Sequence, residues 1–88
     1  MSETPAEVAG VEPIPGWNAA RQRVLTRYAK QARYSAQRIR GHAVRYGHDL
    51  AAVEPECAAL ERYADACELA AADPNLPTPE YKQIEEAA

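Results

Sequence analysis

The sequence contains no phenylalanine, one tryptophan and one methionine, so large apolar side chains are scarce. A chain of 88 residues with so few of them builds a thin core, and alanine, which favours helices, fills many of the apolar positions. No apolar run approaches the roughly 20 residues that a membrane-spanning helix requires. The N-terminus lacks the basic and apolar segments of a secretory signal. We therefore expect a small soluble protein with a cytoplasmic location.

Motifs of catalysis and of metal binding are also missing. The sequence has no glycine-rich phosphate loop, no GxSxG and no HExxH, so we expect no enzyme activity and no cofactor. Cys57 and Cys67 are ten residues apart in one predicted helix. That spacing is about 15 Å, which is beyond the reach of a disulfide, so both are expected to be reduced core thiols. There is no CxxC motif and both histidines lie in another element, so no metal site is expected.

Negative charge is missing from the middle of the chain. Between Trp17 and His48 there is no aspartate or glutamate, whereas the same segment holds eight cations. From Asp49 onward, ten acidic residues are accompanied only by Arg62 and Lys82. The net charge of −3 therefore hides a basic middle and an acidic C-terminal half. A helix with charge of one sign needs opposite charge from its own molecule or from a partner.

The segment 19–46 has the periodicity of a long amphipathic helix. It contains no proline, and Asn18 is placed to cap its start. Apolar and small side chains recur at intervals of three and four residues along one stripe: Leu25, Tyr28, Ala32, Ser35, Ile39, Ala43 and Tyr46. A basic face lies nearly opposite this stripe and consists of Arg23, Arg27, Lys30, Tyr34, Arg38 and Arg45. Arg33 and Arg40 widen the basic face on one flank.

A second helix is expected over 55–72, with Pro55 in its first turn. Gly47 follows the end of the first helix, and Asp73 before Pro74 ends the second. Apolar residues of the second helix recur at intervals of four and three: Val53, Cys57, Leu60, Ala64, Cys67 and Ala71. Three acidic residues are expected to face outward: Glu61, Asp65 and Glu68.

These elements predict an all-α fold, an antiparallel two-helix hairpin over 17–72 followed by a linker and a short third C-terminal helix within 73–88. Thr78 as an N-cap and Pro79 as the first helical residue mark the start of this third helix. Residues 1–16, with several prolines and glycines, are expected to form a flexible N-terminal tail. A lone hairpin has almost no interior, so we also expect a homo-oligomer, a dimer that forms a four-helix bundle.

Residues 28–39 resemble a helix-turn-helix DNA-binding unit. Arg33 departs from the pattern, because it stands where the turn of such units usually has glycine. The resemblance implies that Tyr34 is buried just after the turn, whereas a continuous helix exposes Tyr34 among arginines. The resemblance also assigns a small contact residue, a helix cap, a core anchor and two base-reading side chains, which are Ala29, Ser35, Ile39, Gln37 and Arg38.

The basic face has three interpretations that the sequence leaves open. It is either an exposed surface neutralised by the acidic helix of the same hairpin, or a nucleic-acid site, or a contact with an acidic protein. Arginine suits phosphate and tyrosine stacks on bases, but the acidic half of the chain repels a polyanion. Arginine, tyrosine and tryptophan are also favoured at protein interfaces.

We therefore expect a small non-enzymatic interaction, assembly or regulatory factor that presents its basic helix face to an acidic protein partner. One alternative is nucleic-acid binding by the same helix, and another is a host- or phage-encoded inhibitor of another protein. Membrane binding is not expected, because the alanine-rich stripe has few side chains to insert. The bias toward arginine and alanine is typical of a GC-rich bacterium or its phage.

Overall fold

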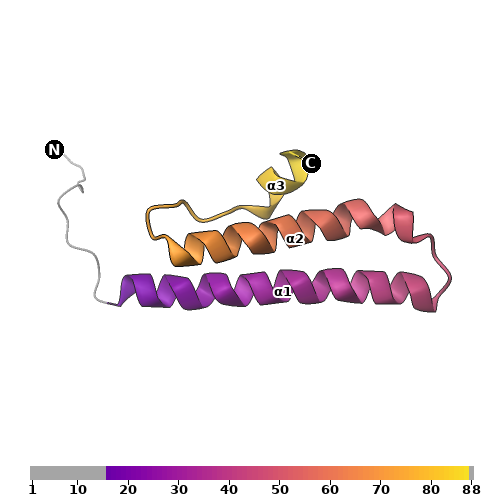
Figure 1. Cartoon of the computed structure of the whole chain (residues 1–88), viewed down its shortest axis with the longest axis horizontal. Coiled ribbons are helices and arrows are strands. Elements are labelled where there is room, and N and C mark those ends of the chain that lie inside the picture. Colours follow the sequence, from indigo (N-terminus) through magenta and orange to yellow (C-terminus); the bar gives the residue numbers. More distant parts are fainter. Residues whose placement is uncertain (1–15, 88) are drawn as a thin grey trace.

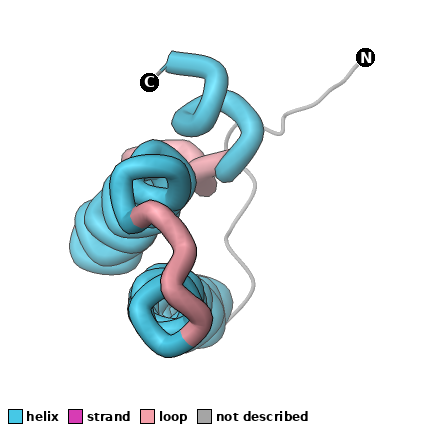
Figure 2. Tube along the Cα trace, turned by 90° about the vertical axis from the view of Figure 1, so that its right-hand side faces the viewer, coloured by secondary structure: helices cyan, strands magenta, loops and turns pink. Residues whose placement is uncertain are grey.

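The computed structural model describes residues 16–87, and this part of the chain is helical without a strand. Helix α1 spans Trp17–Arg45, α2 spans Leu50–Ala72 and α3 spans Tyr81–Ala87. Helices α1 and α2 run antiparallel and pack along their length (Figure 1), and α3 lies on the far side of α2 from α1 (Figure 2). The predicted all-α hairpin with a short third helix is confirmed. Apart from Gly16, the predicted N-terminal tail lies outside the described residues.

Glycines stand at both ends of α1. Gly16 precedes the helix with a φ of 79°, and no side chain caps the first turn, so Asn18 is not the N-cap that the sequence suggested. At the other end Gly47 has a φ of 70°. The backbone N–H of His48 donates to the carbonyl of Ala43 at 2.8 Å, and the N–H of Gly47 donates to Val44 at 3.4 Å. This pair of bonds is the Schellman ending that the predicted role of Gly47 requires.

Helix α2 begins at Leu50, earlier than the predicted start at residue 55. The carboxylate of Asp49 accepts a hydrogen bond from the backbone N–H of Ala51 at 3.0 Å and caps the helix there. Pro55 consequently lies inside α2, where its missing N–H costs one intrahelical hydrogen bond. At the other end, Asp73 has an extended backbone with a φ of −132°, and the helix ends where the sequence predicted.

The contact between α1 and α2 is made mainly of small side chains. Leu25, Cys57 and Cys67 are the largest side chains that are fully buried. The sulfur of Cys57 lies 3.6 Å from the carbonyl oxygen of Ala36, and both cysteines are free thiols, as predicted. Burial raises the pKa of both thiols. The remaining buried residues are all alanines: Ala29, Ala32, Ala36, Ala43, Ala59, Ala64 and Ala70.

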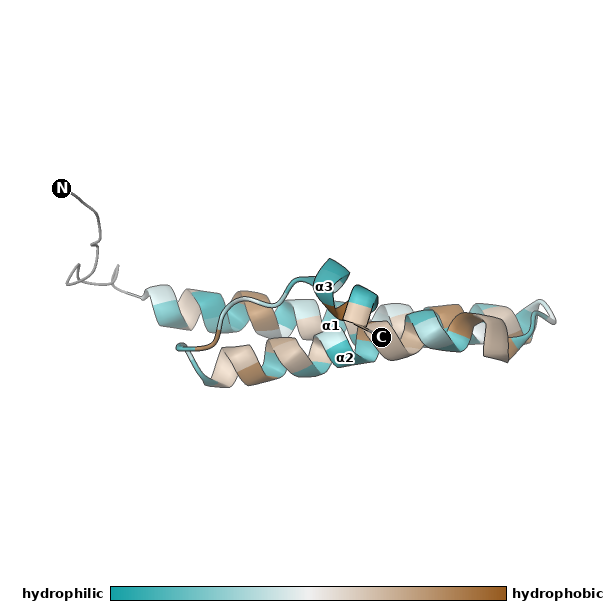
Figure 3. Ribbon diagram, turned by 90° about the horizontal axis from the view of Figure 1, so that it is seen from above, coloured by the Kyte–Doolittle hydropathy of each residue, from teal (hydrophilic) through white to brown (hydrophobic). Residues whose placement is uncertain are grey.

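The buried stripe of α1 is rotated from the predicted one. Tyr28, Ser35 and Tyr46 were expected in the core but are exposed, whereas Ala29 and Ala36 are buried. The rotation brings alanines against the small residues of α2, so that the two backbones approach closely and the tyrosines stay at the edge. Helix α2 is mostly tan and brown, the colours of apolar residues, with teal bands between them (Figure 3).

Helix α3 and the segment before it cover part of α2 on the side away from α1. The rings of Tyr63 and Tyr81 meet edge to face, with centroids 5.8 Å apart. Burial, followed by a hydrogen bond with Cys67, raises the pKa of Tyr63 to about 12. The structure has α3 beginning at Tyr81, slightly later than the predicted start at Pro79.

Candidate interaction surface of α1

The predicted basic face points away from the hairpin contact, and Arg38 at its margin also lines a groove between α1 and α2. An α-helix turns about 100° per residue, so residues nine positions apart, such as Leu25 and Tyr34, lie on opposite sides. Leu25 is buried against α2, and Tyr34 is 61% exposed. We call this surface the outward face of α1, and all of its members are exposed: Arg23, Arg27, Lys30, Tyr34, Arg38 and Arg45.

Two further arginines of α1 lie on one flank of the hairpin and pair with α2. The Arg33 guanidinium donates to Asp65 at 2.8 Å and to Glu68 at 2.7 Å. Its neighbour along the flank, Arg40, bridges two glutamates of α2. Arg40 Nη1 lies 2.6 Å from Glu61 Oε2, and Arg40 Nη2 lies 2.9 Å from Glu54 Oε1. We call this row the ion-pair flank. Its acids Asp65 and Glu68 are exposed, as the sequence suggested, but they lie on the side of α2 from which they reach arginines of α1.

The ion-pair flank changes the acid–base properties of its members. Hydrogen bonds from Arg40 lower the pKa of Glu54 and of Glu61, although partial desolvation opposes the shift. Hydrogen bonds to Asp65 and Glu68 likewise raise the pKa of Arg33, and Arg40 shifts in the same direction. These side chains remain partly exposed, so each pair stabilises the fold only modestly.

Arg21 has a different role from the other arginines. Its guanidinium donates to the backbone carbonyl of Ala70 at 2.7 Å and to that of Leu76. Ala70 lies in the last turn of α2, and Leu76 lies in the segment after it. Arg21 therefore connects the start of α1 to the end of α2 beside it. A cation at the C-terminal end of α2 also complements the helix dipole.

The outward face lacks such partners. None of its five cations forms an ion pair with an acidic side chain anywhere in residues 16–87. Tyr34 lies in the middle of this face, and the guanidinium carbon of Arg38 lies 5.9 Å from its ring centroid. Arg23, Arg27 and Lys30 line a shallow hollow of about 410 Å³. The acids of α2 thus neutralise the flank of α1 and leave its outward face positive.

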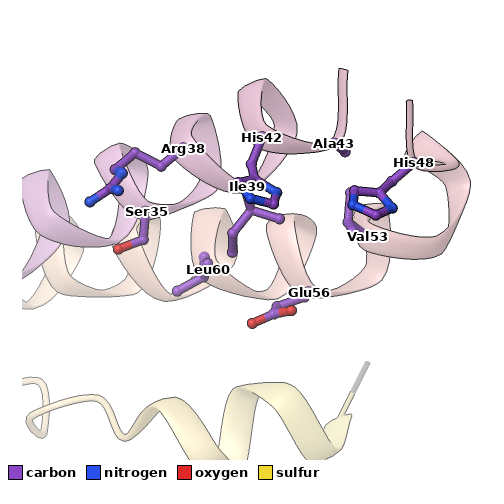
Figure 4. A pocket seen from close by; sticks show the side chains of 9 residues that line it. All are labelled: Ser35, Arg38, Ile39, His42, Ala43, His48, Val53, Glu56 and Leu60. Carbon is purple, nitrogen blue, oxygen red and sulfur yellow. The ribbon is translucent and has the colours of Figure 1, made fainter. Parts of the chain in front are cut away.

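The structure also contains a groove that sequence reasoning missed. It opens between α1 and α2 on the side opposite the ion-pair flank, near the hairpin turn, and has a volume of about 560 Å³. Figure 4 shows Ile39, Val53 and Leu60 between the two helices. Arg38 and Glu56 lie at its opposite edges. The sequence did contain a signal for this groove. The apolar stripe predicted on α1 was wider than the small residues of α2 can cover, so part of it had to remain open.

The rings of His42 and His48 line the groove near the hairpin turn. The His42 ring stacks on that of His48 with 5.8 Å between centroids, and it meets Tyr46 at 4.6 Å.

Among residues 16–87 there is no cluster of three or more histidine, cysteine, aspartate or glutamate side chains with the arrangement of a metal site. Over the same range, no helix has the length and apolar character to span a membrane.

Comparison with known proteins finds no matching family model, no matching curated protein and no matching solved structure.

Proposed function

We propose that this chain is a non-enzymatic binding or assembly factor that presents the outward face of α1 to an acidic surface of a protein partner. The supporting observation is the division of the cations of α1 into two groups. Arg33 and Arg40 form ion pairs with four acidic residues of α2, whereas the outward cations have no acidic partner in residues 16–87. Their charge is therefore available to another molecule.

The outward face is electrostatically unfavourable for the isolated chain. Arg23 and Arg27 are four residues apart and Lys30 follows three residues later, so like charges are neighbours on the helix surface. Such pairs destabilise a helix by about 0.2–0.5 kcal/mol each. Acidic side chains of a partner would remove this repulsion. The exposed Tyr34 adds a flat apolar surface of the kind favoured at protein interfaces.

Charge density favours a protein partner over nucleic acid. From Arg23 to Arg45 the outward face runs about 33 Å along the helix axis. It carries five cations over that length, whereas a DNA duplex has one negative charge per about 1.7 Å. The chain as a whole carries a net charge of −3, which repels a polyanion. An acidic patch on a protein matches this sparse row of cations better.

Nucleic-acid binding is the second candidate, because α2 and its acids lie on the other side of α1 from the outward face. The Arg38–Tyr34 contact would offer a stacking surface for an unpaired base. The helix-turn-helix version of this candidate is wrong. Helix α1 continues through Arg33 without a turn, and Tyr34 is exposed rather than buried.

The inhibitor alternative is a special case of the main proposal. A chain that covers an acidic surface of another protein blocks that surface for other ligands. Inhibition follows where the covered surface is a functional one.

Partner capture with two matched variants tests the proposal. The outward variant carries Arg27→Glu and Arg45→Glu, and the control variant carries Arg62→Glu and Lys82→Glu on α2 and α3. We expect acidic proteins from a nuclease-treated lysate to bind the wild-type chain and the control variant but not the outward variant. Equal binding to both variants would contradict the proposal.

Fluorescence anisotropy with labelled duplex DNA and single-stranded RNA distinguishes the second candidate. Titrations at about 50 and 200 mM salt identify binding through phosphate contacts, because the affinity of such binding falls by orders of magnitude over that range. We expect weak binding at both salt concentrations. Micromolar binding that falls steeply with salt and disappears in the outward variant would contradict the protein-partner proposal and support nucleic-acid binding.

The proposal also includes self-association of the hairpin into a homodimer with four packed long helices. Among residues 16–87 the largest fully buried side chains are Leu25, Cys57 and Cys67, so a single hairpin hides little apolar surface. A second copy would supply the missing cover.

A further inference from the structure

The two long flanks of the hairpin differ in how they are closed. On one flank, Arg33 and Arg40 reach across to acids of α2 and cover the contact between the helices. On the other flank no ion pair joins α1 to α2 within residues 16–87. That side holds the groove of about 560 Å³ described above. One flank is thus sealed by the chain itself, and the other is open.

The floor of the groove is apolar and its edges are charged. Ile39 of α1 and Val53 and Leu60 of α2 are half-buried and lie between the helices (Figure 4). Arg38 forms the edge on α1, and Glu56 forms the edge on α2. Neither charged side chain forms an ion pair with another residue in 16–87.

Helix α3 lies beside this flank through the contact of Tyr81 with Tyr63. Burial raises the pKa of Tyr81; the charges of Glu85 and Glu56 add to the shift, and the charge of Arg62 opposes it. Tyr81 itself lines a smaller hollow with Tyr28 and Leu60, farther along the same flank. At the groove the open flank therefore carries positive charge at Arg38 on the α1 side and negative charge at Glu56 on the α2 side.

We infer that this groove is the contact surface for a second copy of the chain, with a twofold axis parallel to α1 and α2. A rotation about such an axis places α1 of each copy against α2 of the other at the same level along the hairpin. Arg38 of each copy then faces Glu56 of its partner, and the apolar floors meet between them. The result is a bundle of four long helices closed by two symmetric ion pairs.

A groove with one edge of each sign fits its own copy better than it fits a molecule of single charge. A twofold interface requires a surface that is complementary to itself. An acidic protein would be repelled by Glu56, and the same carboxylate would repel nucleic acid. The inference rests on the homodimer proposed above, but it does not depend on the partner of the outward face.

Mixing two charge-reversed chains tests the inference directly. Arg38→Glu alone makes both edges acidic, and Glu56→Arg alone makes both edges basic. Two copies of either variant therefore repel each other at both symmetric contacts. A mixture of the two variants, however, pairs one acidic groove with one basic groove and restores both ion pairs in trans. Arg38 and Glu56 are exposed, so neither change is expected to impair folding.

Sedimentation velocity of the full chain gives the readout. We expect a dimer for wild type, a dissociation constant raised at least about tenfold for each single variant, and recovery in the equimolar mixture. Arg27→Glu, on the outward face, serves as the control and should dimerise like wild type.

Three outcomes would overturn the inference, and they separate it from the proposed function. A monomeric wild type at all concentrations would refute the groove contact and the homodimer, while binding by the outward face would stand. A dimer that neither single variant weakens would place the contact on another surface. Weakened variants that fail to recover on mixing would refute the pairing of Arg38 with Glu56.

Discussion

Enlarging Ala36 is the most informative test of how α1 and α2 pack. Its side chain is fully buried, and its carbonyl oxygen lies 3.6 Å from the sulfur of Cys57. Ala36→Leu adds three carbon atoms at a point where the two backbones approach closely, so the helices must move apart. Overpacking of this kind costs about 1–3 kcal/mol. In a domain of this size the melting temperature should fall by roughly 4–20 °C.

Ser35→Leu is the matched variant, because it adds a leucine one residue earlier. Ser35 is exposed and lines the open groove, where a larger side chain has room. We expect its free energy of unfolding to change by less than about 0.5 kcal/mol. Thermal melts followed by far-ultraviolet circular dichroism, at two protein concentrations, separate packing from self-association. A stable Ala36→Leu chain together with an unstable Ser35→Leu chain would refute the observed rotation of α1 and support the stripe expected from the sequence.

Two further predictions concern the ion-pair flank and the glycines. Because the pKa values of Glu54 and Glu61 are lowered in the folded state, their pairing with Arg40 stabilises the fold above the usual glutamate range and is lost as pH falls through the lowered values. Arg40→Gln should therefore destabilise the chain in urea titrations at pH 7. The difference from wild type should shrink only as pH falls below the usual glutamate range, and a difference independent of pH would contradict this. Gly47→Ala should cost about 1–2 kcal/mol because its φ is 70°. Gly41 is helical and exposed near the C-terminal end of α1 with open space around it, so Gly41→Ala should gain about 0.5–1 kcal/mol. Denaturant midpoints that shift in the same direction for both would contradict the conformational reason.

Much of the helical organisation follows from local sequence signals. Gly47 and Asp73 before Pro74 mark helix ends through backbone geometry alone, and the structure has both ends where they were expected. The outward position of the basic face also follows from helical periodicity. Tyr34 is nine residues from Leu25 and must lie on the opposite side of a continuous helix.

The features that sequence reasoning missed depend on packing between helices. The sequence predicted that α2 starts at Pro55. The helix begins earlier because the carboxylate of Asp49 accepts a hydrogen bond from the N–H of Ala51 and caps it there. The rotation of α1 was not predictable from its own sequence, since Tyr28 and Ala29 are both acceptable core residues. Only the small residues of α2 make the alanine side the better contact.

The sequence raised charge pairing across the hairpin but did not show which arginines take part. Arg33 and Arg40 lie about 80–160° around α1 from the outward arginines. Their partners become evident only when the relative rotation of both helices is known. The same rotation opens the groove on the opposite flank. The basic face is exposed on α1 as its periodicity predicted, its role as a binding surface stays a prediction, and only the structure shows which cations of α1 pair with α2.

Thermal stability of two neutralised variants tests the central claim, that the outward cations are not needed for the fold. One variant carries Arg23→Gln, Arg27→Gln and Arg45→Gln, and the other carries Arg33→Gln and Arg40→Gln. We expect the first to melt within a few degrees of wild type or slightly above it, since neutralisation relieves repulsion between like charges. The second should melt clearly lower because it removes the ion pairs with α2. An outward variant that is destabilised as much as the flank variant would mean that the outward face is held by acids of its own chain, and it would contradict the proposed binding surface.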